Sequence, residues 1–229
     1  MKKETISPFY RQPADINPFP HSFIAIEGNI GAGKTTLCKM LEDDFECRLI
    51  LEQFTDNPFL PEFYKNPERH AFPVELFFMT ERHKQLQESL SQRELFPQLM
   101  VADYFFIKTL LFAKTNLNDE EYRLFQRLFH TLNTGFRRPD LLVYLHRSVP
   151  DLVNNIQKRG RAIEAKIKLD YLQSLQDAYF NYFKSEHDLP ILIIDVTEVD
   201  FWSDETAYKK IVGLMKRSYP KGIHRAAIR

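Results

Sequence analysis

An eight-residue run near the N-terminus has the residue types and spacing of a phosphate-binding loop. Residues 28–35, here called the phosphate loop, fit the pattern G-x-x-x-x-G-K-S/T between an apolar strand and a helix. Backbone N–H groups of such a loop and the positive end of the helix dipole attract phosphate oxygens. The residues expected to hold the nucleotide are Gly28, Asn29, Ile30, Gly31, Ala32, Gly33, Lys34, Thr35 and Thr36. Lys34 would meet the β- and γ-phosphates, and the Thr35 hydroxyl can bind Mg²⁺.

Three residues have the types that an acceptor site needs. Glu52 follows the second predicted strand, where ligands of open α/β sheets bind, and its carboxylate could take a proton from a hydroxyl. Glu75 lies in the apolar run Phe-Pro-Val-Glu-Leu-Phe-Phe-Met, and Arg82 lies two helical turns later on the same face. The pair could bracket a flat polar ligand. A solvated loop acid at 52 and a partly exposed helix-edge acid at 75 remain the alternatives.

Two arginines flank a glycine further along the chain. Arg159 and Arg161 surround Gly160 just after a predicted helix. On a segment that closes over a triphosphate they would stabilise the charge of the transferred phosphoryl group. Ordinary helix capping explains the same residues, because glycine and cations are favoured at helix C-termini.

Short apolar runs alternate with helical patterns. The runs at 22–27, 48–51, 99–102, 140–146 and 190–195 predict strands, and helices are expected at about 34–45, 68–91, 105–114, 119–133, 150–159, 167–185 and 204–217. The alternation predicts a doubly wound, three-layer α/β fold of the P-loop NTPase type, with a five-stranded parallel sheet, helices on both faces and an arginine-containing lid. We expect an extended arm at 1–21, the domain at 22–217 and a solvated basic tail at 218–229.

Composition excludes several classes of protein. The 229 residues carry 31 Lys and Arg against 31 Asp and Glu, so no overall field attracts nucleic acid or a membrane surface. Two cysteines are too few for a disulfide scaffold, and no apolar run approaches about 18 residues. The sequence therefore predicts a cytoplasmic protein that binds small molecules.

Several motifs, in their joint order and spacing, resemble the deoxynucleoside kinase family. The resemblance runs from about Phe23 to Phe201. Its motifs are Gly-Asn-Ile-Gly-Ala-Gly-Lys-Thr-Thr at 28–36, Asp-Asn-Pro-Phe-Leu-Pro-Glu-Phe-Tyr at 56–64, Pro-Glu-Arg-His-Ala-Phe at 67–72, Pro-Asp-Leu-Leu-Val-Tyr-Leu at 139–145, Lys-Arg-Gly-Arg-Ala-Ile-Glu at 158–164 and Asp-Tyr-Leu at 170–172. The first motif is widespread, whereas the combination is specific to the family.

The resemblance implies roles for individual residues. Glu52 matches the carboxylate that accepts the 5′-hydroxyl proton, and Arg159 and Arg161 match lid arginines. Tyr64 and Glu164 match a pair that holds the sugar 3′-hydroxyl. Arg82 matches an arginine of the base pocket, and Phe112 matches an aromatic that stacks on the base, although a core aromatic remains the alternative at 64 and 112. The resemblance also implies a homodimer, formed through the apolar faces of the helices at 68–91 and 105–133.

The sequence departs from the family pattern at two places. Glu75 stands where the family usually has glutamine, and a carboxylate only accepts hydrogen bonds, which suits the N1–H and N2–H₂ groups of guanine and favours a purine. Ala102-Asp103-Tyr104 stands where the family has an acid-Arg-Ser/Thr motif. Asp103 is expected near the Mg²⁺ ion, but the motif arginine is absent. Lys108 stands where several relatives have an aspartate.

We therefore predict an enzyme that uses ATP and Mg²⁺ to phosphorylate the 5′-hydroxyl of a deoxyribonucleoside. A kinase for another acceptor, such as a nucleoside monophosphate, would need an arginine cluster near residues 52–90, where Arg69, Arg82 and Arg93 are widely spaced. A nucleotide-binding regulatory module with a degraded kinase site is the third hypothesis, which the missing arginine supports.

Overall fold

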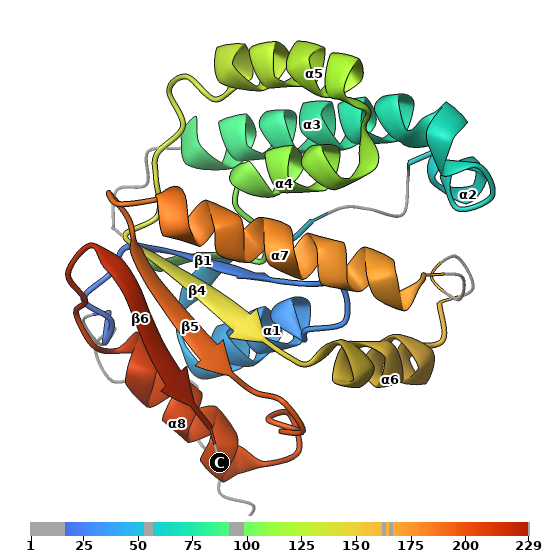
Figure 1. Cartoon of the computed structure of the whole chain (residues 1–229). Helices are drawn as coiled ribbons and strands as arrows, with labels where there is room; N and C mark the ends of the chain where they lie inside the picture. The colour runs from blue at the N-terminus through green and yellow to red at the C-terminus, as the bar shows by residue number, and fades with distance from the viewer. Residues whose placement is uncertain (1–16, 53–56, 92–98, 162–163, 165–166, 229) are drawn as a thin grey trace, which may run out of the picture.

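Strands and helices alternate along the chain (Figure 1). The structure is a computed structural model that describes residues 17–52, 57–91, 99–161, 164 and 167–228. Its strands are β1 (Phe23–Gly28), β2 (Cys47–Ile50), β3 (Leu99–Ala102), β4 (Leu141–His146), β5 (Pro190–Asp195) and β6 (Gly222–Ala227). Its helices are α1 (Lys34–Asp44), α2 (Leu60–Phe63), α3 (Pro67–Ser91), α4 (Ile107–Asn116), α5 (Asp119–Leu132), α6 (Val149–Arg159), α7 (Leu169–Ser185) and α8 (Glu205–Met215).

The described strands form one parallel sheet in the order β2-β3-β1-β4-β5-β6. The strand order reverses at β1, which has β3 on one side and β4 on the other. A crevice at such a reversal is where open α/β sheets bind ligands. The phosphate loop leaves β1 at this point and enters α1, as predicted.

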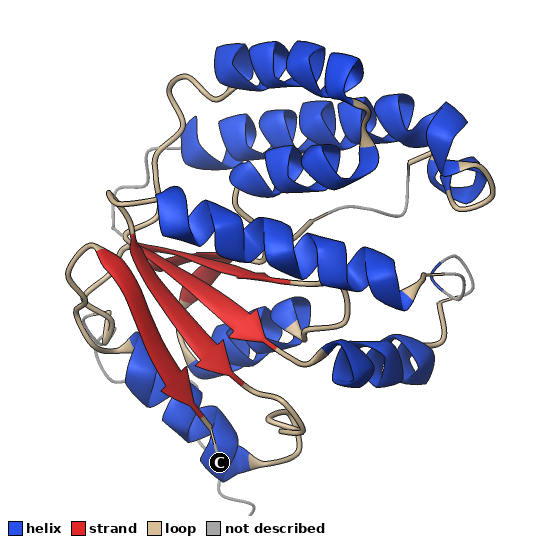
Figure 2. Ribbon diagram, viewed as in Figure 1, coloured by secondary structure: helices blue, strands red, loops and turns tan. Residues whose placement is uncertain are grey.

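Helices cover both faces of the sheet (Figure 2). On one face, α1 and α8 pack against the alternate strand residues that include Ile24 and Val143. On the other face, α7 packs against Ala25 and Tyr144. A further apolar cluster joins α3, α4 and α5. In it the ring of Phe106 stacks on that of Phe129 at a centroid distance of 5.0 Å. β1, β4 and β5 read as continuous apolar runs because both of their faces are buried.

The predicted fold class is confirmed, but the number of strands is wrong. The described sheet has six strands, because residues 222–227 form β6 where we expected a solvated basic tail. β6 pairs in parallel with β5, with Ile191 opposite Ile223. Its residues alternate between half-buried and exposed positions, as expected of an edge strand, so charged side chains such as Arg225 hide its strand character in the sequence.

The described segment before β1, residues 17–21, belongs to the predicted extended arm. Phe19 is 4% exposed, and its ring meets that of Phe45 at a centroid distance of 5.0 Å. The His21 ring is within hydrogen-bond distance of the Arg217 carbonyl, at 3.0 Å. Residues 17–21 therefore pack against the domain, while residues 1–16 of the predicted arm lie outside the described part of the chain.

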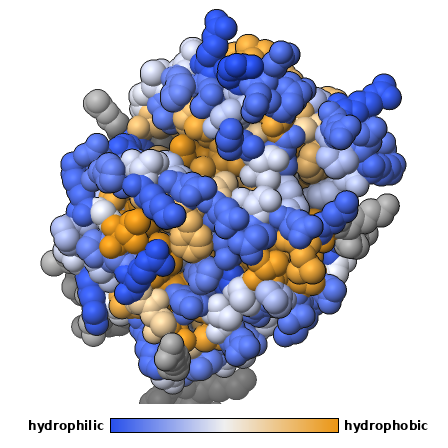
Figure 3. Space-filling model, viewed as in Figure 1, coloured by the Kyte–Doolittle hydropathy of each residue, from blue (hydrophilic) through white to orange (hydrophobic). Residues whose placement is uncertain are grey.

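The surface mixes polar and apolar side chains. Figure 3 shows apolar patches surrounded by hydrophilic side chains on the face seen in Figure 1. The exposed large apolar side chains of the described residues are Phe59, Leu124, Leu128, Leu169, Trp202 and Ile223. Within the ranges that the structure describes, no helix has both the length and the apolar character that a membrane crossing requires.

Candidate active site

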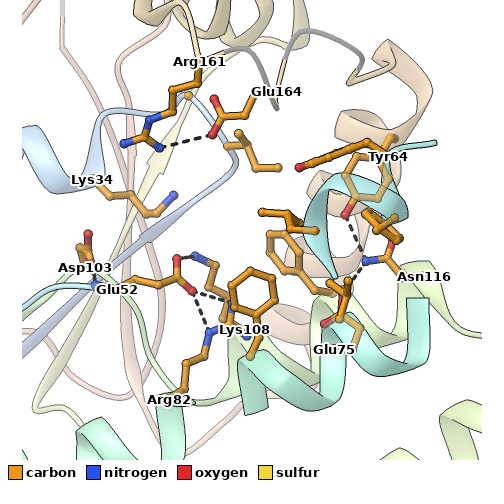
Figure 4. A pocket seen from close by; sticks show the side chains of 18 of the residues that line it. Lys34, Glu52, Tyr64, Glu75, Arg82, Asp103, Lys108, Asn116, Arg161 and Glu164 are labelled. Carbon is orange, nitrogen blue, oxygen red and sulfur yellow. Dashed lines mark hydrogen bonds and ion pairs between the residues drawn. The ribbon is translucent and has the colours of Figure 1, made fainter. Parts of the chain in front are cut away.

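A cleft at the carboxyl ends of β1, β2 and β3 gathers most of the predicted site residues (Figure 4). It encloses about 840 Å³, counting space open to solvent. Its walls come from the phosphate loop, the strand ends, α2, α3, α4, α7, the end of α6 and the segment that follows it. The predicted residues that line it are Ile30, Gly31, Lys34, Thr35, Glu52, Tyr64, Glu75, Arg82, Asp103, Phe112, Arg159, Arg161 and Glu164.

The other predicted residues of the phosphate loop lie behind or beside this cleft. Gly33 and Thr36 line an adjoining hollow together with Arg147 and Trp202. Asn29 is buried and donates from Nδ2 to the Leu172 carbonyl at 2.7 Å, which ties the loop to α7. Gly28 and Ala32 belong to the packed backbone of the loop.

The glycines of the phosphate loop are required by its shape. Gly31 and Gly33 have φ angles of 83° and 96°, in the left-handed region that favours glycine. A Cβ atom on Gly33 would lie 2.9 Å from the Phe201 ring, and one on Gly31 would lie 2.8 Å from a backbone oxygen. The loop therefore has no room for larger residues at these two positions.

Lys34 closes the phosphate loop on itself. Its Nζ donates to the Gly28 and Asn29 carbonyls, each at 2.9 Å. Burial lowers the pKa of Lys34 to about 8, and the nearby cation of Lys108 acts in the same direction. The ammonium group is thus held at the mouth of the loop, within the cleft.

Asp103 connects the phosphate loop to Glu52. Its Oδ2 accepts a hydrogen bond from the Thr35 hydroxyl at 2.5 Å, and its Oδ1 accepts one from the Glu52 backbone N–H at 2.7 Å. The neighbouring Tyr104 is buried and donates to Gln85, which donates in turn to the Leu51 carbonyl. The Asp-Tyr pair thereby holds the segment directly after β2, which carries Glu52.

Two cations hold the Glu52 carboxylate (Figure 4). Arg82 Nε donates to Oε1 at 2.8 Å, Arg82 Nη2 forms an ion pair with the same oxygen at 2.6 Å, and Lys108 Nζ lies 2.5 Å from Oε2. Both cations are buried, and Arg82 also donates to the Thr109 hydroxyl at 3.0 Å. Although burial acts in the opposite direction, Lys108 and Arg82 hold the pKa of Glu52 well below its usual range. Glu52 is therefore an ionised carboxylate.

The far end of the cleft has apolar walls with a small polar group. Val74, Phe78 and Phe112 line the cleft here, and Lys108 Nζ lies 5.5 Å from the centre of the Phe112 ring. Asn116 Nδ2 donates to Glu75 Oε1 at 2.6 Å and to the Tyr171 hydroxyl at 3.2 Å. Such a space suits a flat heterocycle with polar edges.

The arginines at the end of α6 and just after it, Arg159 and Arg161, meet a nearby acid. Arg159 and Arg161 each form an ion pair with Glu164, and the Arg161 contact is 3.3 Å long. All three line the cleft beside Lys34. Residues 162–163 and 165–166 of the predicted lid lie outside the described residues.

Three polar residues of the cleft were not predicted from the sequence: Lys108, Asn116 and Tyr171. Lys108 is one of the two cations on Glu52, and the other two belong to the polar group around Glu75. The signal for Lys108 was its place one helical turn before Phe112, on the same face of α4. No comparable spacing connects Asn116 with Tyr171, which lie on different helices.

Comparison with known proteins agrees with this geometry. The profile of the deoxynucleoside kinase family matches residues 24–218. A deoxyguanosine kinase of Bacillus subtilis is 35% identical over 198 residues, which cover 85% of this chain and 96% of that protein. A deoxyadenosine kinase of Dictyostelium discoideum is 30% identical over 199 residues, which cover 86% and 78%.

Solved structures share the fold. The structure of a deoxyadenosine kinase from M. mycoides with bound dATP superimposes with a TM-score of 0.73 at 23% identity, covering 85% of this chain and 99% of that one. The family match, the identity over most of both chains and the cleft beside the phosphate loop lead to one conclusion: this chain is a phosphotransferase that belongs to the deoxynucleoside kinase family.

Proposed function

We propose that this chain transfers the γ-phosphoryl group of ATP to the 5′-hydroxyl of a deoxyribonucleoside, in nucleotide salvage. One observation carries the proposal: the cleft joins the phosphate loop, an ionised Glu52 and a space with apolar walls in a single continuous site. The relatives named above are kinases of purine deoxynucleosides, which favours a purine acceptor here.

In the proposed reaction the phosphate loop and the arginines hold the triphosphate. Lys34 would leave its two carbonyl partners for the β- and γ-phosphates, and Arg159 and Arg161 would leave Glu164 for the γ-phosphate. Glu164, once released, and Tyr64 would hold the sugar 3′-hydroxyl. The hollow beside Trp202 leaves room for the nucleoside part of ATP.

Glu52 is proposed to take the proton of the 5′-hydroxyl. A carboxylate has about four lone-pair sites, of which Arg82 and Lys108 occupy three in this arrangement. One site on Oε2 remains for the attacking hydroxyl. Because the two cations fix the orientation of the carboxylate, the hydroxyl would be aimed at the phosphate rather than freely rotating.

Thr35 and Asp103 are proposed to hold Mg²⁺. A hydroxyl and a carboxylate, 2.5 Å apart at the mouth of the phosphate loop, are hard oxygen ligands of the kind that Mg²⁺ accepts beside phosphate oxygens. When bound, the ion would neutralise charge on the phosphates.

The proposal is tested by incubating the protein with Mg-ATP and each of the four deoxynucleosides. We expect ADP and a deoxynucleoside 5′-monophosphate to appear in equal amounts, measured by chromatography. Tight ATP binding with no turnover of any deoxynucleoside would instead favour a nucleotide-binding module. Lys108 opposes that alternative, since it places a second cation on Glu52 although the family's motif arginine is absent.

We further propose that the chain forms a homodimer and that it works in the cytoplasm. Leu124 and Leu128 stay exposed one turn apart on α5, with 48% and 37% of their surface open, and a second copy would cover them. Cys38 and Cys47 are free thiols, which suits a reducing compartment.

The dimer prediction can be checked by size-exclusion chromatography with light scattering. The unchanged protein is expected at twice the mass of one chain, and a variant with Leu124→Asp and Leu128→Asp is expected at the mass of one chain, because the charges could not be buried in an apolar interface. A double variant that kept the dimer mass would place the interface elsewhere.

A further inference from the structure

Glu75 is a buried acid with an unused oxygen. It is 2% exposed on α3, within an apolar stretch of the cleft wall. Oε1 accepts from Asn116 Nδ2, but Oε2 accepts no hydrogen bond from any residue that the structure describes. A buried polar atom without a partner costs about 1–3 kcal/mol. Since Glu75 lines the cleft, a bound ligand is the natural partner of Oε2.

The surroundings of Glu75 leave its charge finely balanced. Burial raises the pKa of Glu75 to about 7, although Arg82, the Asn116 hydrogen bond and Lys108 act in the opposite direction. Burial raises the pKa values of Tyr64 and Tyr171, so both phenols stay neutral. The charged or titratable side chains that line the same cleft are Lys34, Glu52, Tyr64, Arg82, Asp103, Lys108, Arg159, Arg161, Glu164 and Tyr171. At neutral pH, both the carboxylate and the neutral acid are therefore populated.

The two forms of a carboxyl group match different purines. The carboxylate only accepts hydrogen bonds, and guanine offers two adjacent donors, N1–H and N2–H₂. The neutral acid has one donor and keeps acceptor capacity, and adenine offers the acceptor N1 beside the donor N6–H₂. Because Oε1 already accepts from Asn116, the proton of the neutral form belongs on Oε2, the oxygen without a protein partner.

We propose that Glu75 selects the purine through its own protonation state, binding guanine as a carboxylate and adenine as a neutral acid. With guanine, the carboxylate oxygens accept from N1–H and N2–H₂. With adenine, Oε2–H donates to N1 and the other oxygen accepts from N6–H₂. The inference rests on the proposed function and names the substrates of that site: both purine deoxynucleosides, in proportions set by pH.

The test is the number of protons exchanged when each nucleoside binds to the full chain, measured by titration calorimetry near pH 7 in two buffers with different ionisation enthalpies. Deoxyadenosine is expected to take up protons and deoxyguanosine to release them, with a difference of about one proton at most. The ratio of kcat/KM for deoxyguanosine over deoxyadenosine should rise about tenfold or more from one pH unit below 7 to one above. The other titrating groups act on both nucleosides alike, so this ratio isolates the group that contacts the base.

A Glu75→Gln variant keeps the position of the side chain but removes its titration. Its amide has the donor and acceptor of the neutral acid, so the variant is expected to favour deoxyadenosine at every pH, with no difference in proton exchange between the two nucleosides. Glu88→Gln, at an exposed position on the same helix, should keep the pH-dependent ratio of the unchanged protein. Equal proton exchange for both nucleosides would overturn the inference while leaving the kinase function intact. Failure of both purine nucleosides to bind would overturn the inference, and the proposed function would be contradicted only if none of the four deoxynucleosides were phosphorylated.

Discussion

The turnover of a deoxynucleoside is expected to fall by about 10²- to 10⁴-fold in a Glu52→Gln variant. The amide keeps the shape of the side chain and can still accept hydrogen bonds from Arg82, but it cannot take the proton of the attacking hydroxyl. The measurement is the initial rate of ADP formation at saturating ATP over a range of nucleoside concentrations. The loss should appear in kcat, since proton transfer belongs to the chemical step.

The same variant should bind ATP as the unchanged protein does, because the phosphate loop is not altered. Calorimetric titration with ATP is therefore the check that the variant has folded. Glu62→Gln is a matched control: Glu62, on α2, forms an exposed ion pair with Lys65, which follows the helix, and such pairs contribute little. If Glu52→Gln kept the full rate, Glu52 would lose its proposed role as the base.

Lys108→Met is expected to destabilise the protein by about 3 kcal/mol, because it removes one partner of a buried ion pair. The Lys108 and Glu52 side chains are 5% and 14% exposed, with 2.5 Å between Nζ and Oε2. Arg82 still pairs with the carboxylate, which places the effect near the lower end of the range for buried pairs. For a chain of this length the midpoint of thermal unfolding should fall by roughly 6–12 °C. Turnover should fall as well, because Glu52 would keep only one of its two fixed partners.

A double-mutant cycle distinguishes this interaction from a simple loss of packing. In the background of Glu52→Gln, Lys108→Met should destabilise the protein by at least about 1 kcal/mol less than it does alone, since no carboxylate is then left without its cation. Lys114→Met, an exposed cation on the same helix, should change stability by about 1 kcal/mol or less. An unchanged unfolding midpoint for Lys108→Met would show that Lys108 contributes nothing to holding Glu52.

Contiguous features of this protein could be predicted from its sequence. The phosphate loop is one uninterrupted run whose chemistry depends on its own backbone. Its residue pattern therefore predicted both that the loop follows β1 and that α1 begins within it. The inner strands β1, β4 and β5 could be predicted because burial on both faces requires apolar residues at almost every position. β6 could not, because an edge strand buries only part of its side chains and carries charges on the rest.

The composition of the site was predicted less completely than the loop. Glu52, Glu75 and Arg82 were selected because acids and cations stood beside strand ends or apolar runs, and the structure brings all three to one cleft. Which side chains pair with one another was not predictable. The contact of Arg82 with Glu52 was not predicted, nor was Lys108 as the second cation on this carboxylate.

By itself the sequence determined the phosphate loop, the class of fold and the acids and arginines available for chemistry, because each depends on neighbouring residues or on burial of a whole segment. Only the tertiary structure decided how those groups are charged and paired. The Glu52 ion pairs join α3 and α4 to the end of β2, and the group of Glu75, Asn116 and Tyr171 joins three helices. Such contacts depend on distances across the fold and on exclusion of water from the cleft, and neither is recorded in the spacing of residues along the chain.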